Sequence, residues 1–228
     1  MPIEDNLAAV HQRIAEACTA AGRPPTAARL LAVSKAFGPD AIRAAIAAGQ
    51  TEFGENYFQE AVGKIAQLPR AGLAWHFIGP LQSNKTKGIA ENFDWVHSVD
   101  RIKTASRLSE QRPADLPTLQ VCVQVNISAE ASKSGCTPEE TPELCGAIAK
   151  LPRIKLRGLM AIPALGASER DSRAAYRRLR ELFESLQRAG HDLDTLSAGM
   201  SDDLEAAIAE GSTLVRVGTA IFGERNYA

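Results

Sequence analysis

The chain has 228 residues, with 26 Lys+Arg against 27 Asp+Glu, so its formal net charge at pH 7 is −1. Hydrophobic residues make up 45% and charged residues 23%, proportions typical of a globular protein and not of a disordered or fibrous one. A charge near zero and only 5% of aromatic residues argue against a nucleic-acid partner, because such proteins carry basic patches or stacking platforms. This length fits one large domain or two small ones, and because no segment is typical of a linker we expect one domain over residues 1–228.

The cysteines and the N-terminal segment predict a soluble cytoplasmic protein with no membrane contact. The cysteines are Cys18, Cys122, Cys136 and Cys145, with no C-x-x-C pair. This spacing fits neither a zinc site nor a disulfide scaffold, and reduced thiols suit the cytoplasm. The first 18 residues are acidic and periodic, unlike a signal peptide, and no apolar run approaches the roughly 18 residues of a membrane span.

The hydrophobic pattern begins with a helix over residues 3–21 and continues with alternating strands and helices. The predicted strands cover residues 29–35, 51–55, 75–81, 95–99, 119–127, 155–162, 195–198 and 214–222. Helices are predicted between them, over residues 39–49, 56–68, 83–91, 101–111, 137–150, 168–189 and 202–210, several of them starting at capping residues such as Thr137, Ser168 and Asp202. Eight strand–helix units favour a single closed (β/α)8 TIM barrel with an extra N-terminal helix, and an open doubly wound sheet is the alternative.

A lysine closes the first apolar strand, because Lys35 ends the run AVSK over residues 32–35. Active residues of a (β/α)8 barrel gather where the strands end, on the C-terminal face. A lysine there with a desolvated stem can have a lowered pKa and act as a Schiff-base amine. The alternative is an ordinary lysine whose amine reaches solvent beyond the strand end.

Two segments near the C-terminus suit a phosphate site: residues 196–204 (LSAGMSDDL) and 215–223 (VRVGTAIFG). The last two strands of such a barrel often supply one, with glycines that let backbone amides approach the phosphate. Ser201, Gly218 and Thr219 are the candidate residues. The alternative is ordinary turn chemistry, because turns also need glycine, serine and aspartate.

An arginine and two histidines lie inside predicted strands. Arg216 sits among valines, and because a buried unpaired charge is very costly it must find an acceptor. Either it pairs in the core with an acidic neighbour such as Glu52, or it donates to a ligand. His76 and His97, in the third and fourth strands, are interpreted as satisfied core groups more readily than as bases.

Seven motifs spread over nearly the whole chain resemble those of a known family. They are AVSK (32–35), FGENYFQE (53–60), WHFIGPLQSNK (75–85), VNIS (125–128), SKSG (132–135), GLMAIP (158–163) and LSAGMSDDLEAAIAEGSTLVRVGTAIFG (196–223). In these motifs the chain is similar to the pyridoxal phosphate homeostasis proteins, single-domain relatives of the alanine racemase N-terminal barrel.

The resemblance implies that the chain binds pyridoxal 5′-phosphate (PLP) as a covalent aldimine on a lysine, with the phosphate on backbone and hydroxyl donors and an arginine at the pyridine nitrogen. The residues at the matching positions are Lys35 for the aldimine, Ser201, Gly218 and Thr219 for the phosphate, Arg216 for the pyridine nitrogen, and Asn56 and Met160 for the remaining lining.

The chain departs from the family pattern at two places. Family members often read VSKTK, whereas here Ala36 and Phe37 follow Lys35, so a second lysine near the cofactor is absent. LSAGMS stands in place of the commoner LSMGMS, a change that affects packing only. Lys133, in SKSG, matches a family position and is a candidate for a secondary contact with the aldehyde.

The resemblance and cofactor chemistry together favour a carrier over an enzyme. An arginine at the pyridine nitrogen leaves it unprotonated, so the ring is a poorer electron sink than one paired with a carboxylate. The related racemases take their opposite-face tyrosine from a second domain, and in a chain of 228 residues we expect no such domain. We therefore expect a non-catalytic, monomeric PLP carrier that acts in vitamin B6 and amino-acid homeostasis, with apo-enzymes as possible recipients.

Two enzymatic alternatives stay open at this point. The first is a weak PLP-dependent amino-acid racemase, which sustained turnover lost on replacing Lys35 would support. The second is a Schiff-base aldolase acting on a phosphorylated sugar. Such aldolases typically carry their lysine on the sixth strand, where this chain has Met160.

Overall fold

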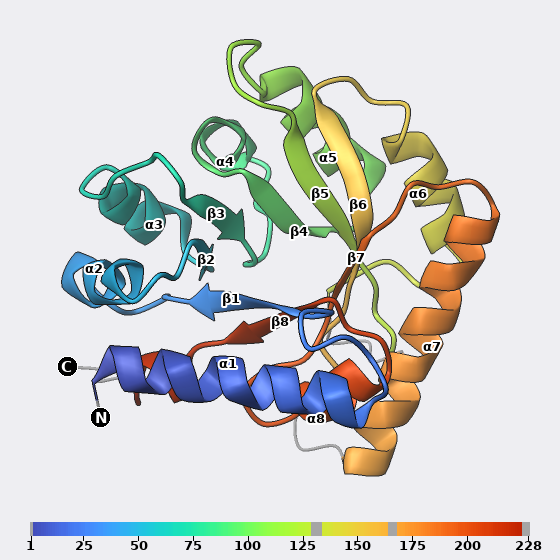
Figure 1. Cartoon of the computed structure of the whole chain (residues 1–228). Coiled ribbons are helices and arrows are strands. Elements are labelled where there is room, and N and C mark those ends of the chain that lie inside the picture. Colours follow the sequence, from blue (N-terminus) through green and yellow to red (C-terminus); the bar gives the residue numbers. More distant parts are fainter. Residues whose placement is uncertain (1, 129–133, 164–167, 225–228) are drawn as a thin grey trace.

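The computed structural model describes residues 2–128, 134–163 and 168–224. Within these residues eight parallel strands form a closed barrel in sequence order, and β1 completes it by pairing with β8, with Leu31 opposite Arg216 (Figure 1). The strands are β1 (Arg29–Val33), β2 (Glu52–Glu55), β3 (Ala74–Phe77), β4 (Trp95–Val99), β5 (Leu119–Gln124), β6 (Ile154–Met160), β7 (Thr195–Ser197) and β8 (Leu214–Val217). The predicted (β/α)8 barrel is confirmed.

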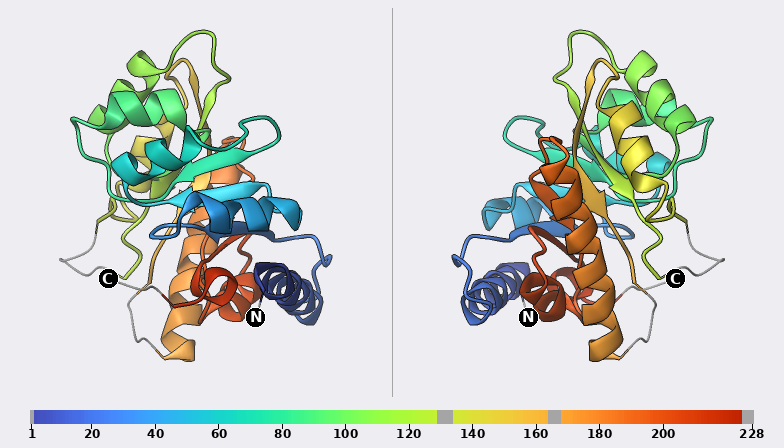
Figure 2. Two further views of the ribbon diagram at one scale, coloured as in Figure 1. Left: turned by 90° about the vertical axis from the view of Figure 1, so that its left-hand side faces the viewer. Right: turned by 90° about the vertical axis from the view of Figure 1, so that its right-hand side faces the viewer.

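Helices surround the barrel in both side views (Figure 2). They are α1 (Ile3–Ala20), α2 (Pro39–Ala47), α3 (Phe58–Ile65), α4 (Thr86–Asn92), α5 (Ile102–Gln111), α6 (Thr141–Ile148), α7 (Glu169–Arg188), α8 (Leu204–Ala209) and α9 (Thr219–Phe222). The extra N-terminal helix α1 buries Leu7, Val10 and Ile14 and packs beside α8 and α9. None of the helices in the described ranges is long and apolar enough to cross a membrane.

Successive residues of each strand face the helices and the barrel interior in turn. In β1, Leu30 and Ala32 belong to the large apolar cluster beneath the helices, so Leu31 between them points inward. The interior holds a small apolar cluster and a run of buried polar side chains: Trp95, Cys122 and Met160 in the former, and His76, His97, Ser197 and Arg216 in the latter. These buried polar side chains are the first indication that the barrel interior has a role beyond stabilising the fold.

The last predicted strand, residues 214–222, is wrong beyond Val217. The backbone of Gly218 (φ −121°, ψ −69°) leaves the extended conformation, and the chain turns directly into α9. Five other predicted strands also extended too far, because their last residues form loops at the C-terminal face of the barrel. These strands end at Val33, Phe77, Gln124, Met160 and Ser197.

The three predicted helix caps have different outcomes. Ser168 caps α7 as predicted, because its hydroxyl accepts a hydrogen bond from the N–H of Asp171 at 3.2 Å. Asp202 does not cap α8, which begins at Leu204 after a turn over residues 200–203. Thr137 exchanges hydrogen bonds with Glu140 one turn before α6 begins.

All four cysteines are free and buried, in agreement with the prediction of no disulfide. Burial raises the pKa of the Cys122 thiol, inside the barrel, to about 12. Burial likewise raises the pKa of Cys145 on α6 to about 12. These two thiols therefore stay protonated and inert at neutral pH.

Candidate functional site

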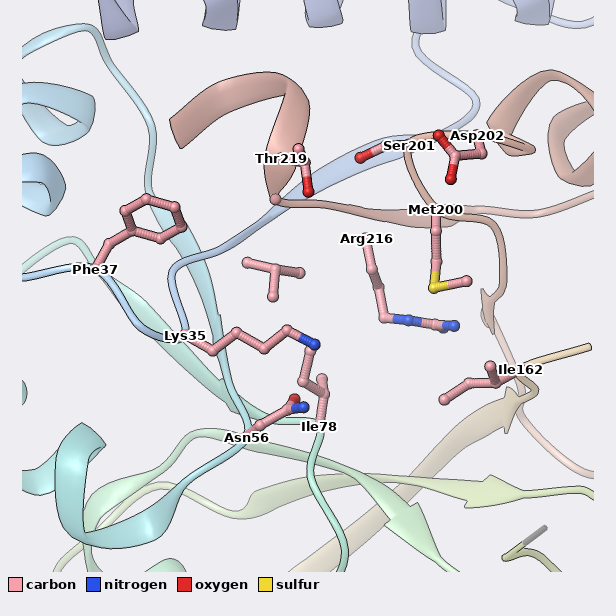
Figure 3. A pocket seen from close by; sticks show the side chains of 12 residues that line it. Lys35, Phe37, Asn56, Ile78, Ile162, Met200, Ser201, Asp202, Arg216 and Thr219 are labelled. Carbon is pink, nitrogen blue, oxygen red and sulfur yellow. The ribbon is translucent and has the colours of Figure 1, made fainter. Parts of the chain in front are cut away.

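A pocket of about 280 Å³ opens at the carboxyl ends of the strands. Its lining comes from β1, β8 and the loops after β1, β2, β3, β6, β7 and β8, so distant parts of the sequence meet there (Figure 3). The lining residues are Val33, Lys35, Phe37, Asn56, Ile78, Ile162, Met200, Ser201, Asp202, Arg216, Gly218 and Thr219. Six of the seven predicted site residues are among them.

Lys35 follows β1, and the backbone on both sides of it is anchored. The carbonyl oxygen of Ser34 accepts a hydrogen bond from Lys64 Nζ at 2.9 Å. The N–H of Ala36 donates to Glu60 Oε1 at 2.8 Å, and Ala36 has φ 67°, a left-handed conformation that non-glycine residues seldom adopt. This turn directs the half-buried side chain of Lys35 into the pocket (Figure 3).

A buried cation on α3, Lys64, organises the turn. Its Nζ lies 2.9 Å from Glu55 Oε1 and also pairs with Glu60. Ser34 Oγ donates to the same Glu55 oxygen at 2.6 Å. Burial raises the pKa of Glu55, and the charge of Lys64 opposes that rise. Because both members of the Lys64–Glu55 pair are buried, removing either one leaves an uncompensated charge in the core.

Arg216 reaches the pocket from β8 and is held by neutral acceptors. Its Nη1 donates to Ser197 O at 2.7 Å and Ser197 Oγ at 2.8 Å, and its Nη2 donates to Ala161 O at 3.0 Å. The alternative ion pair with Glu52 is not formed, because Glu52 pairs instead with Arg29. Burial lowers the pKa of the Arg216 guanidinium. The remaining donors of this fixed cation are available to a ligand in the pocket.

One end of the pocket gathers hydrogen-bond donors. The hydroxyl groups of Ser201 and Thr219 lie near each other there, next to the first turn of α9 at Gly218 (Figure 3). The N–H groups of a helix's first turn have no partner within the helix. The loop before Ser201 requires glycine, because Gly199 has φ 92° and an added Cβ would lie 2.6 Å from Ala207 Cβ. Donors of this kind suit an oxyanion such as phosphate.

Two carboxylates follow Ser201 and would repel a phosphate if both faced it. Asp203 turns away from the pocket, since one of its oxygens accepts the N–H of Met200 at 2.7 Å. Its other oxygen accepts the hydroxyl of Tyr176, on α7, at 2.6 Å. Asp202 is exposed and stands at the pocket rim. Asp203 therefore holds the loop of residues 200–203 in place, while its carboxylate does not face the pocket.

Replacing Tyr176 by Phe should loosen this loop. Burial raises the pKa of Tyr176, so the hydroxyl stays protonated and donates to Asp203. Losing a hydrogen bond to a charged acceptor is expected to lower the free energy of unfolding by about 1.5–3 kcal/mol. Chemical denaturation measures this, and amide exchange at Met200 should speed up. The control is Tyr57→Phe, on an exposed side chain; equal effects of the two substitutions would contradict the assignment.

The two residues predicted for the remaining lining, Asn56 and Met160, have different outcomes. Asn56 lines the pocket, and its carbonyl oxygen packs so closely on Gly79 that an added Cβ would lie 2.1 Å away. Met160 is not among the lining residues; it is buried in the small cluster inside the barrel. Ile162, two residues further along the chain, lines the pocket instead.

The sequence interpretation missed several lining residues. Phe37 had been noted only for lacking an amine, whereas it lines the pocket and stacks on Phe222 of α9 at 5.1 Å between ring centroids. Ile78, Ile162 and Met200 gave no signal, because an apolar residue after a strand looks the same as a core residue. Lys133 lies outside the described residues.

Comparison with known proteins agrees with this geometry. The family model for the alanine racemase N-terminal domain matches residues 6–226. The pyridoxal phosphate homeostasis protein of Pseudomonas aeruginosa is 61% identical over 225 residues, which cover 99% of this chain and 96% of that protein. The protein of the same name from Escherichia coli is 54% identical over 229 residues, covering 99% and 98%.

A solved structure is also similar over most of the chain. The structure of PipY from Synechococcus elongatus with PLP bound is 38% identical, with a TM-score of 0.80, and the match covers 92% of this chain and all of that one. The fold and site thus define a barrel of the alanine racemase N-terminal class. Within that class, the chain belongs to the family of pyridoxal phosphate homeostasis proteins.

Proposed function

We propose that this protein binds PLP in the pocket between Lys35 and Arg216 and keeps it in store for the cell, without catalytic turnover. The observation that carries the proposal is the meeting, in one pocket of about 280 Å³, of a lysine amine, a buried guanidinium and a cluster of hydroxyl and amide donors. The names of the relatives and the PLP-bound structure of PipY support it.

The lining residues suit three polar groups of PLP: the aldehyde, the ring nitrogen and the phosphate. The amine of Lys35 suits the aldehyde, and the guanidinium of Arg216 suits a ring nitrogen that accepts a hydrogen bond. Ser201, Gly218 and Thr219 suit the phosphate. The cavity lies near the lower end of the roughly 300–1,000 Å³ typical of small-molecule pockets, so it suits a single small ring.

We propose Lys35 as the covalent anchor. When bound, PLP supplies an aldehyde that condenses with a primary amine to give a Schiff base and one water molecule. Lys35 is the amine that the turn at Ala36 directs into the pocket, and the anchors on Ser34 and Ala36 fix its backbone. A fixed anchor lowers the entropy cost of placing the amine against the aldehyde.

The composition of the pocket supports storage over turnover. A guanidinium that donates to the ring nitrogen leaves that nitrogen unprotonated, which weakens the ring as an electron sink. Two-base racemisation needs an acid on the face opposite the lysine. Among the described lining residues the titratable groups are Lys35, Asp202 and Arg216, and Asp202 stands at the rim beside the phosphate donors.

The proposal extends to the cell. We propose a monomeric, single-domain carrier that works in the cytoplasm and delivers PLP to apo-enzymes. Four free, buried cysteines are consistent with a reducing compartment. The relatives' common name, homeostasis protein, supports a role in supply rather than in a committed reaction.

Phosphate recognition is tested by titrating the protein with PLP and with pyridoxal, which lacks the phosphate. Each hydrogen bond to a charged group contributes about 1.5–3 kcal/mol, so PLP should bind about 100-fold more tightly or better. Replacing Ser201 by Ala should reduce the ratio of the affinity for PLP to the affinity for pyridoxal. Ser185→Ala, on the exposed surface of α7, should leave this ratio unchanged. Equal affinity for the two aldehydes would contradict the proposed phosphate site.

Absence of turnover is tested by incubating the PLP-loaded protein with L-amino acids in D2O. Deuterium exchange at the α-carbon should not exceed that of free PLP at the same concentration. Sustained exchange or racemisation that disappears in Lys35→Ala would instead establish the weak racemase.

A further inference from the structure

Beneath the pocket, a column of buried polar side chains crosses the barrel interior. It runs from Arg216 to Ser197 Oγ at 2.8 Å, then to His97 Nδ1 at 2.9 Å, and from His97 Nε2 to His76 Nδ1 at 2.9 Å. His76 Nε2 in turn faces Glu52 Oε2 at 3.9 Å. The column links strands β8, β7, β4, β3 and β2, starting at the pocket and ending at the opposite end of the barrel.

If the Ser197 hydroxyl hydrogen is given an acceptor, the hydrogen bonds of the column all point the same way. Arg216 carries only donors, so Ser197 Oγ must accept from it. The one hydrogen of Ser197 Oγ then goes to His97 Nδ1, the other group bonded to it in the described part of the chain. His97 is left with its proton on Nε2 and donates to His76 Nδ1. His76 likewise carries its proton on Nε2, directed at Glu52.

Burial keeps both histidines neutral, as this pattern requires. Both side chains are fully buried. Burial lowers the pKa of His97 to about 3, with the charge of Arg216 adding to the effect. Burial also lowers the pKa of His76 well below its usual range. Each ring therefore has one N–H and one acceptor nitrogen, which is what a one-way chain needs.

The far end of the column is the carboxyl group of Glu52, whose pKa burial raises and the charge of Arg29 lowers. Glu52 Oε2 and His76 Nε2 are buried and make no hydrogen bond with the described residues; at 3.9 Å they face each other beyond hydrogen-bond distance. The other oxygen of Glu52 pairs with Arg29. A row of aligned N–H and O–H dipoles ending on a carboxylate stabilises a cation at its other end.

We propose that Ser197, His97 and His76 act as positioning residues that hold the Arg216 guanidinium toward the pocket and connect it electrostatically to Glu52. Their effect on a ligand rests on the proposed function, because it is exerted at the ring nitrogen of PLP. The chain of bonds itself belongs to the ligand-free protein and can be tested there.

The first test is ¹⁵N NMR of the histidine side chains in the protein without PLP. His76 and His97 should both show the neutral tautomer protonated at Nε2, unchanged between pH 5 and pH 8, with the exposed His11 as the reference signal. Protonation of either ring in this range, or a proton on Nδ1, would overturn the proposed direction of the column. This result is independent of whether the protein binds PLP.

The second test removes single links and measures affinity for two ligands. Ser197→Ala and His97→Leu should each weaken PLP binding about tenfold, the effect expected of a hydrogen bond to a charged group. Neither should weaken binding of the PLP analogue in which a ring C–H replaces the nitrogen. The matched control is Cys122→Ala, which removes a buried interior sulfur atom outside the column.

An equal loss of affinity for PLP and for the analogue would show a general structural effect and overturn the positioning role. Unchanged affinity for PLP and for the analogue would also overturn the positioning role. Ser197→Ala removes a single oxygen atom, so it keeps the test decisive if His97→Leu does not fold. If the wild-type protein binds neither ligand, the proposed function fails, and the NMR result still decides whether the column exists.

Discussion

Replacing Lys35 by Ala is expected to abolish covalent capture of PLP and to weaken its binding by about 100-fold or more, roughly 2.7 kcal/mol. The variant loses the amine that the turn at Ala36 directs into the pocket, while Arg216 and the phosphate donors remain. Two measurements check this: mass spectrometry after borohydride reduction, which should find no adduct, and dialysis, which should remove the ligand.

Pyridoxamine 5′-phosphate provides the control for Lys35→Ala, because it keeps the ring and phosphate but has no aldehyde. It should bind the wild type and the variant with similar affinity. Lys87→Ala, on an exposed helical side chain, should leave both PLP capture and affinity unchanged. A reducible adduct that persists in the Lys35→Ala variant would show that another amine is the covalent anchor.

Replacing Lys64 by Met is expected to lower the free energy of unfolding by about 3–5 kcal/mol. The substitution leaves Glu55 and Glu60 without their cation and frees the carbonyl oxygen of Ser34. Because Ser34 and Glu60 anchor the turn around Lys35, the rate of Schiff-base formation should fall as well. Urea denaturation measures the stability, and stopped-flow absorbance on adding PLP measures the rate.

The stability deficit of Lys64→Met should grow with pH. Without Lys64 the pKa of Glu55, already raised by burial, rises further, so the folded variant binds a proton that the unfolded chain has released. Stability then falls as the pH rises above the unfolded carboxyl pKa of about 4.3, so the deficit is larger at pH 8 than at pH 5. A deficit that shrinks toward pH 8 would refute the assignment of Glu55.

Two variants control for the loss of a lysine. Lys87→Met removes an exposed ion pair with Glu91 and should cost no more than about 0.5 kcal/mol. Adding Glu55→Gln to Lys64→Met removes one of the stranded carboxylates and should recover part of the lost stability. Equal costs for the two single lysine substitutions would show that the Lys64 network contributes little.

The sequence predicted the barrel because each part of the pattern agreed with the others. Eight β-rich runs alternate with helical stretches, and the strand ends carry the glycines and polar residues of a C-terminal face. The errors at strand ends have one cause. Residues such as Ile78, Ile127 and Ile221 have high strand propensity, yet they lie in loops or in α9, where tertiary contacts decide the conformation.

The candidate site was predictable where the chemistry is unusual for its position. A lysine closing an apolar strand and an arginine among valines both stand out, and both line the pocket. Met160, which the resemblance implied, lies in the barrel interior and not among the lining residues, because inward positions of a strand lie at different depths. The sequence did not predict the Lys64 network or the histidine column, because the first joins a helix to a strand and the second joins residues of different strands.

The most direct test of the central claim is an absorption spectrum of the PLP-loaded protein before and after borohydride, followed by peptide mapping of the reduced product. The account predicts a visible Schiff-base band that disappears on reduction and a stable label on Lys35 alone. A colourless protein that stays unlabelled in excess PLP, or a label on another lysine, would contradict it.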